Sequence, residues 1–157
     1  MRVHIATDHA GMELSSHLVT TLSAKGFEVV DHGPAAYDAE DDYPGFCIKA
    51  ALAVVADQAE GIDALGIVLG GSGNGEQIAA NKVKGARAAL AWNLDTAKLA
   101  REHNDANVVA VGGRQHTVEE ATELIEAFLG EPFSSADRHV RRIGQIAAYE
   151  ATGEVGE

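Results

Sequence analysis

Residues 65–81 read LGIVLGGSGNGEQIAAN, a stretch that joins a strand, a glycine-rich turn and the start of a helix. The continuous apolar run Leu65–Leu69 is typical of a strand that is covered on both faces, as in a parallel sheet. The turn Gly70–Gly75 has glycine at four of its six positions, and the successive backbone N–H groups of such a turn can bind an anion. Glu76 then places a carboxylate at the mouth of the helix. The stretch therefore predicts one βα unit of a parallel α/β fold, with a polar turn at its centre.

The end of this turn distinguishes between two kinds of site. A nucleotide-binding loop ends in lysine and a hydroxyl, whereas this turn ends in Asn74, Gly75 and Glu76, whose charge repels a phosphate in the same cradle. A base beside a site for an oxyanion suits removal of a proton from carbon next to a carbonyl, with Ser72 and the turn amides holding the oxyanion. The alternative is a plain turn in which Glu76 only interacts with the helix dipole. The helix start lowers the pKa of Glu76 and removal from water raises it, so the sequence leaves the balance open.

Strand-like segments alternate with helical ones along the rest of the chain. The expected strands are 2–7, 27–31, 65–70, 87–91 and 107–112. Helices are expected from the spacing of Leu14, Leu18 and Leu22, after Pro44, from a cap at Asp95 to about His103, and from the capping box that begins at Thr117. Repeated βα units predict a doubly wound, Rossmann-like three-layer α/β fold with a five-stranded parallel sheet.

The C-terminal part departs from this alternation. After Gly130-Glu131-Pro132, one more helix is expected over about 134–150, with no strand before it. We therefore expect a single domain over 1–150 that includes this extra helix, followed by a flexible tail over 151–157.

The overall composition excludes several classes of partner. The 157 residues are 46% hydrophobic and 23% charged, with no apolar run near membrane-spanning length. A formal net charge of −12 at pH 7 repels nucleic acid and anionic lipid. The N-terminus lacks the pattern of a signal peptide, and the single cysteine, Cys47, fits a reducing compartment and reads as a core residue. We therefore expect a cytoplasmic protein that binds neither nucleic acid nor membrane.

Polar clusters follow three of the predicted strands at the edge where parallel sheets bind ligands. Asp8 and His9 follow the first strand, Gly70–Glu76 the third, and Gly112-Gly113-Arg114 the fifth. One such cluster is typical of any βα turn, but three at one edge favour a binding site. Asp8 can cap the next helix, assist acid–base chemistry, or do both.

A second set of candidates lies in the C-terminal third. Arg138 and Arg142 are four residues apart on the last helix, a spacing that suits either a solvated face or a dianion held between two guanidinium groups. His103 is at the end of a helix that runs back to the opposite edge of the sheet. Arg138 is at the start of the last helix, which begins at that same far edge. If these residues are catalytic, they serve a neighbouring subunit, which predicts a two-fold homodimer with shared active sites.

Metal binding is not expected. Asp38, Glu40, Asp41 and Asp42 lack the spacing of a calcium loop and read as a solvated loop. Tyr43, directly after them, can line the site or pack against it.

The segments ATDHAG, DDYP, GGSGNGEQIAANK, REHN, VGGR and RHVRRI together resemble the ribose-5-phosphate isomerase B family of sugar-phosphate isomerases, in particular its actinobacterial branch. The resemblance covers nearly the whole chain in order. It implies a homodimeric aldose–ketose isomerase that works through an enediolate on a small sugar phosphate, without metal or cofactor.

The resemblance also implies roles for individual residues. Glu76 would be the base, with Ser72 and the amides of Gly71, Gly73, Asn74 and Gly75 as the anion hole. Asp8 and His103 would assist ring opening, and Tyr43 and Asn104 would contact the sugar. His9, Arg114, Arg138 and Arg142 would surround the phosphate. Many relatives use a cysteine as base where this chain has Gly70, so Glu76 is the only candidate base here.

The implied reaction is the interconversion of ribose 5-phosphate and ribulose 5-phosphate. Two alternatives stay open. A six-carbon sugar phosphate, such as allose or galactose 6-phosphate, would require only a longer pocket, which the sequence does not reveal. A sugar-phosphate sensor with the same fold and no turnover would require Glu76 to be a mere helix cap.

Overall fold

The computed structural model describes residues 1–156, in which five strands form one parallel sheet in the order β2-β1-β3-β5-β4. The strands are β1 (Arg2–Ala6), β2 (Glu28–Asp31), β3 (Ala64–Gly70), β4 (Ala88–Leu90) and β5 (Val108–Gly112). Every boundary lies within one residue of the predicted one. The predicted fold class, with its five-stranded parallel sheet, is confirmed.

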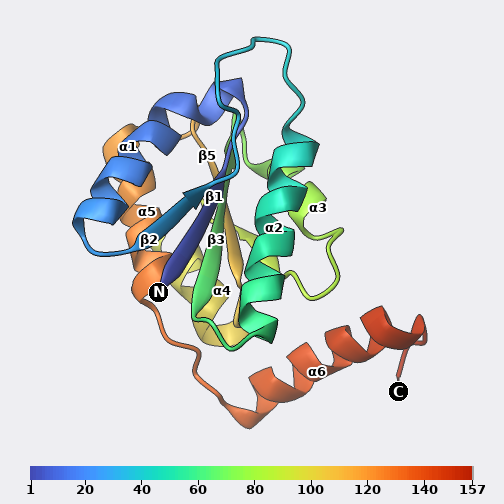
Figure 1. Cartoon of the computed structure of the whole chain (residues 1–157). Coiled ribbons are helices and arrows are strands. Elements are labelled where there is room, and N and C mark those ends of the chain that lie inside the picture. Colours follow the sequence, from blue (N-terminus) through green and yellow to red (C-terminus); the bar gives the residue numbers. More distant parts are fainter. Residues whose placement is uncertain (157) are drawn as a thin grey trace.

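Helices cover both faces of this sheet, which gives the three predicted layers (Figure 1). One face carries α1 (Met12–Ala24), which the short 3₁₀-helix His9–Gly11 precedes, together with α4 (Leu94–Asn104) and α5 (Val118–Gly130). The other face carries α2 (Tyr43–Ala59) and α3 (Asn74–Ala80). The last helix, α6 (Asp137–Thr152), extends beyond the sheet edge at which the strands begin. None of the helices in residues 1–156 has the length and apolar character needed to span a bilayer.

The two faces of the sheet are packed differently. On one face, large side chains such as Leu18, Ile67 and Phe128 fill the space under α1, α4 and α5. On the other face, the residues of α2 that pack against the sheet are small: Cys47, Ala50, Ala51 and Val54. Leu52, a larger apolar residue of the same helix, is 53% exposed. Small residues let α2 lie close to the sheet, which brings its first turn toward the loop after β3.

The helix ends follow local hydrogen bonding, with one correction. Thr117 caps α5 through a capping box with Glu120, as predicted. The cap of α4 is not Asp95, because Asn93 accepts a hydrogen bond from the backbone N–H of Thr96 in a capping box of its own. Helix α6 begins later than expected and continues through Thr152, so the first residues of the predicted tail are helical. The last predicted tail residue, 157, lies outside the described residues.

The chain changes direction across the sheet between β1 and β3. From β1 it moves outward to β2, and from β3 it moves the opposite way to β5 and β4. The loops after β1 and β3 therefore separate at the carboxyl edge, which is the position where open α/β sheets bind ligands. Asp8 and Gly70–Glu76 are in these two loops.

Candidate active site

A cavity of about 470 Å³ opens at this point of the sheet edge. We call it the Glu76 cavity. Its lining comes from the loops after β1, β3 and β5 and from the first turn of α2: Asp8, Tyr43, Gly71, Ser72, Gly75, Glu76, Arg114 and Gln115. The three polar clusters that the sequence assigns to separate loops thus meet around one space.

Glu76 lies in the first turn of α3 and is only 4% exposed. Burial raises the pKa of its carboxyl group, and the negative charge of Asp8 raises it further. The backbone N–H groups of Glu76 and Gly73 act in the opposite direction but do not offset burial. Of the two effects that the sequence leaves in competition, removal from water is therefore the larger. A carboxyl group with a raised pKa is a stronger base once ionised, which suits proton abstraction.

Residue 70 must be glycine for Glu76 to take this position. A β-carbon on Gly70 would overlap the carboxyl group of Glu76. The Glu76 side chain therefore occupies the space that a side chain at position 70 would need, including the cysteine that the resemblance implies there for many relatives. The two side chains would exclude each other sterically.

The loop after β3 is fixed by its own backbone and by the loop after β5. Gly73 has a φ of 81°, a left-handed conformation, and a β-carbon there would lie 2.7 Å from Leu90. The N–H groups of Gly113 and Arg114 donate to the carbonyls of Gly70 and Gly71 at 2.7 and 3.1 Å. These bonds hold the Arg114 side chain beside Gly71 at the rim of the cavity.

The remaining polar groups of this loop are close together. Ser72 Oγ accepts hydrogen bonds from the backbone N–H and the side-chain amide of Asn74, both at 3.3 Å. Ser72 lines the Glu76 cavity, whereas Asn74 lines a neighbouring depression that Trp92 and His116 border. The structure thus gives Ser72 a structural role at the start of α3 in addition to its position in the cavity.

Asp8 caps a short helix and also lies at the Glu76 cavity. Its Oδ1 accepts a hydrogen bond from the backbone N–H of Ala10 at 2.9 Å, which caps the short 3₁₀-helix. Asp8 is 7% exposed and also lines the Glu76 cavity. Its charge contributes to the raised pKa values of both Glu76 and the Cys47 thiol, so all three groups share one weakly solvated region.

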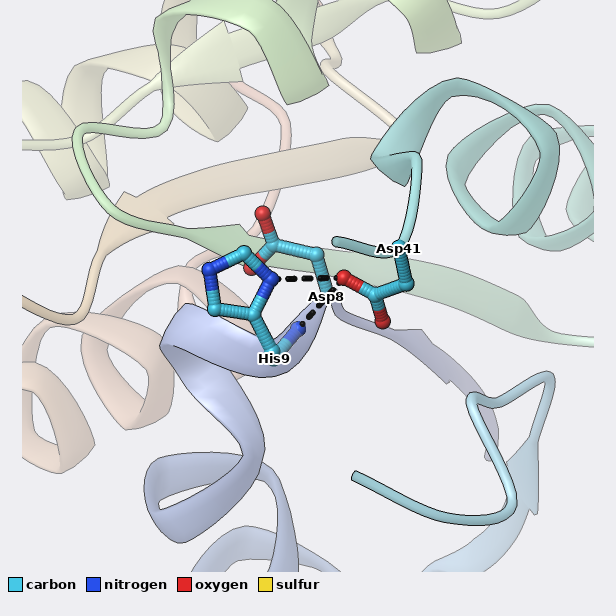
Figure 2. Close-up of side chains that lie close together, drawn as sticks. All are labelled: Asp8, His9 and Asp41. Atoms are coloured by element: carbon cyan, nitrogen blue, oxygen red, sulfur yellow. Dashed lines mark hydrogen bonds and ion pairs between the residues drawn. The ribbon is translucent and has the colours of Figure 1, made fainter. Parts of the chain in front are cut away.

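His9 does not line the cavity directly but is bonded to a residue of the acidic loop. Its backbone N–H and its ring Nδ1 both pair with Asp41 Oδ1, at 3.1 and 2.7 Å (Figure 2). The interpretation of residues 38–42 as a solvated loop is therefore wrong for Asp41, whose side chain is only 8% exposed.

Asp8, His9 and Asp41 are also close enough to offer three ligand atoms to a cation, all within 4.8 Å of one another. In the structure, His9 Nδ1 and Asp41 Oδ1 are paired directly with each other at 2.7 Å. The arrangement is that of a carboxylate that holds an imidazole.

Tyr43 reaches the cavity because residue 75 has no side chain. A β-carbon on Gly75 would collide with the hydroxyl group of Tyr43. Tyr43 is the first residue of α2, so the close packing of this helix on the sheet brings the phenol group of Tyr43 to the Glu76 cavity. Of the two positions that the sequence leaves open for Tyr43, the structure shows it in the lining of the Glu76 cavity.

The other predicted site residues lie away from the Glu76 cavity. The rings of His103, near the end of α4, and His139, in the first turn of α6, are 4.3 Å apart between centroids. Arg138 Nε donates to His139 Nε2 at 3.1 Å. Asn104 lines a separate groove of about 430 Å³ beside α6, and Arg142 is exposed on that helix. This second group is at the amino edge of the sheet, the side predicted from the direction of the helices (Figure 1).

Three residues of these two regions have no signal in the sequence pattern. Gln115 lines the cavity, Asp41 holds His9, and His139 connects His103 with Arg138. His139 is 5% exposed and the only buried residue of α6 in the described chain. Its position one residue after Arg138 in an arginine-rich helix could have suggested a role, but only the packing gives it one.

Known proteins resemble this chain over almost all of its length. The family described as Ribose/Galactose Isomerase matches residues 3–146. The ribose-5-phosphate isomerase B of Mycolicibacterium paratuberculosis is 57% identical over 152 residues, which cover 97% of this chain and 93% of the relative. The protein of the same name from Mycobacterium tuberculosis is 56% identical over 154 residues, with 98% and 93% covered.

Solved structures agree in fold. The ribose-5-phosphate isomerase B of Clostridium thermocellum has a TM-score of 0.90 at 37% identity, covering 98% of this chain and 100% of that one. The enzyme of Mycoplasma genitalium with bound ribulose-5-phosphate has a TM-score of 0.89 at 40% identity, covering 96% and 97%. Since the agreement in sequence and in fold extends over nearly the whole chain, this protein belongs to the Ribose/Galactose Isomerase family.

Proposed function

We propose that this protein interconverts ribose 5-phosphate and ribulose 5-phosphate by proton transfer through an enediolate. The observation that carries the proposal is the buried carboxyl group of Glu76, which lines a cavity together with the amide-rich turn Gly71–Gly75. A plain helix cap would be solvated and would not have a raised pKa. The names of the relatives, and the ribulose-5-phosphate bound in the Mycoplasma genitalium structure, support the choice of substrate.

The reaction requires only groups of the chain and the sugar. After the furanose ring opens, the Glu76 carboxylate removes the proton from C2 of the aldehyde. The electron pair moves to O1, where N–H groups of the turn and Ser72 stabilise the developing charge. The same proton or one from water then returns to C1, while the proton on O2 is transferred to O1, which leaves a ketone at C2 and a hydroxyl group at C1. Because the step is an internal redox change, it needs neither metal nor cofactor.

The remaining site residues are proposed to come from a second copy of the chain. His103 and Asn104 end α4, and Arg138 and Arg142 belong to α6. These parts of α4 and α6 lie at the edge of the sheet opposite the loops that line the Glu76 cavity (Figure 1). In a two-fold dimer, this group would complete the partner's cavity, with the arginines around the phosphate and His103 assisting ring opening. The dianion would also resolve the repulsion between the two guanidinium groups.

The shared site has its own test. Equal amounts of two inactive variants, Glu76→Gln and His103→Ala, are unfolded and refolded together. With random pairing, about half of the dimers would be hybrids, and each hybrid would contain one intact site, so activity should return. No return of activity in mixed dimers that are detected by mass would refute the sharing of sites.

The catalytic test uses Glu76→Gln beside Glu119→Gln, an exposed glutamate in the first turn of α5. We expect the first variant to lose about 100-fold to 10,000-fold in kcat and the second to match the wild type. Exchange of the C2 hydrogen with solvent deuterium separates an enzyme from a sensor, because a sensor without turnover leaves that hydrogen in place. Parallel assays on allose and galactose 6-phosphate decide between five- and six-carbon substrates.

The free, buried state of Cys47 supports a reducing compartment such as the cytoplasm.

A further inference from the structure

The loop that precedes α2 holds His9 through a single carboxylate oxygen. Asp41 Oδ1 accepts from the backbone N–H of His9 at 3.1 Å and pairs with ring Nδ1 at 2.7 Å. The Tyr37 ring of the same loop meets the His9 ring edge-on, with centroids 6.1 Å apart at an interplanar angle of 85°. These contacts fix both the position and the rotation of the imidazole.

The pairing also decides which ring nitrogen carries the proton. A carboxylate can only accept, so the His9 nitrogen that faces Asp41 must be Nδ1–H. The other nitrogen, Nε2, is on the opposite side of the ring from Asp41 (Figure 2). It is the atom left for a ligand, and in the imidazolium form it can donate to an anion.

The burial of Asp41 is hard to explain as loop anchoring alone. Its side chain is 8% exposed, and among the described residues its second oxygen, Oδ2, is buried without a hydrogen-bond partner. Leaving such an oxygen unpaired costs stability, and a residue kept for the fold alone would not need to incur that cost. The adjacent Asp42 is exposed and makes no capping hydrogen bond, although it is the N-cap residue of α2.

We propose that Asp41 is a positioning residue that locks His9 in its Nδ1–H form, with Nε2 directed to the phosphate group of the sugar phosphate. This inference rests on the proposed function for the identity of the ligand. Asp41 itself does not touch the substrate. Its contribution is to hold Nε2 in a fixed direction and to balance the charge of the imidazolium, whose Nε2–H donates to the dianion.

The test combines a spectroscopic measurement with kinetics in full-length protein. Nitrogen-15 spectra of the histidine rings, assigned with a His9→Gln variant, report the tautomer of His9. We expect Nδ1–H in the wild type and a mixture with Nε2–H in Asp41→Ala. Asp41→Asn should keep most of the wild-type tautomer, because its amide oxygen can still accept. Asp42→Asn, which removes the same charge one residue away, should resemble the wild type.

Kinetics then separate positioning from simple damage to the fold. In Asp41→Ala, we expect the KM for ribose 5-phosphate and the inhibition constant of inorganic phosphate to rise about tenfold, with kcat changed less than about threefold. A wild-type His9 in the Nε2–H form overturns the proposal even if Asp41→Ala does not fold. Unchanged KM and tautomer in a folded Asp41→Ala also overturn it. If the wild type lacks isomerase activity, the proposed function fails, while the tautomer and the binding of inorganic phosphate still test Asp41.

Discussion

The carboxyl group of Glu76 occupies the space that a β-carbon on Gly70 would fill. Gly70→Ala should therefore push the carboxylate out of its buried position, and kcat should fall by about 100-fold or more. Gly45→Ala is a matched control, because a β-carbon there meets nothing within 4 Å. Steady-state assays of both variants check this prediction, and an active Gly70→Ala enzyme would contradict the steric argument.

The same overlap predicts that a second kind of base can be installed. Removing the glutamate side chain in Glu76→Ala leaves room for a cysteine at position 70. The double variant Gly70→Cys/Glu76→Ala should turn over faster than Glu76→Ala alone, and iodoacetamide should inactivate it. The single variant Gly70→Cys should be impaired, since both side chains compete for one volume. Rates of the three variants, measured with and without alkylation, test the prediction.

The raised pKa of Glu76 links activity and stability to pH. Burial favours the protonated carboxyl group, so the cost to stability appears as the pH rises through the raised pKa. Below pH 4.5, the ordinary value, both the folded and the unfolded states are protonated and this cost vanishes. We expect Glu76→Gln to raise the free energy of unfolding at neutral pH by about 1 kcal/mol.

Urea unfolding of wild type and Glu76→Gln across this pH range measures the difference. The difference in unfolding free energy should shrink toward zero on the acid side. A difference that stays constant with pH would refute the raised pKa of Glu76. The pH profile of kcat/KM in the wild type should fall on its acid side with an apparent pKa above the ordinary range of a glutamate, because only the ionised carboxylate is a base.

His139 is predicted to orient the groups that we assign to the partner's cavity. Burial, followed by the nearby charge of His103, lowers the pKa of His139, so at neutral pH its Nε2 can accept the hydrogen bond from Arg138. His139→Ala should raise KM about tenfold, since Arg138 loses this partner. Arg141→Ala, an exposed change in the same turn, should have a smaller effect. Acid protonation of His139 removes the acceptor, so the loss in the variant should also diminish at low pH.

Cys47 should be chemically inert in the folded protein. Burial, together with the charges of Glu76 and Asp8, raises the pKa of its thiol to about 12. Only the thiolate reacts with alkylating reagents, so native protein at mildly alkaline pH should not be modified. Denatured protein should be modified fully, which mass spectrometry can measure. Rapid labelling of the native state would show that the region around Glu76 opens.

The sequence determined the architecture because periodicity and turn chemistry are local properties. The apolar run Leu65–Leu69 specified a covered strand, and the glycines after it specified a turn. At Gly70, Gly73 and Gly75 of this turn, a β-carbon would come within 3 Å of a neighbouring atom. The order of strands and helices then implied which loops share the carboxyl edge, and therefore that Asp8, Glu76 and Arg114 would meet. The same reasoning indicated that His103 and Arg138 are at the opposite edge.

Tertiary structure decided the features that depend on contacts between distant segments. Whether Glu76 is a solvated cap or a buried base depends on how closely α2 and the loop after β1 cover it, and no local pattern encodes that distance. The sequence placed Asp41 in an exposed acidic loop. In the structure, this loop packs against His9, 32 residues earlier in the chain, and Asp41 is bonded to it. Burial and charge pairing arise only when residues from distant parts of the chain come together and exclude water. Burial and charge pairing therefore set the chemistry of side chains whose positions the sequence had already indicated.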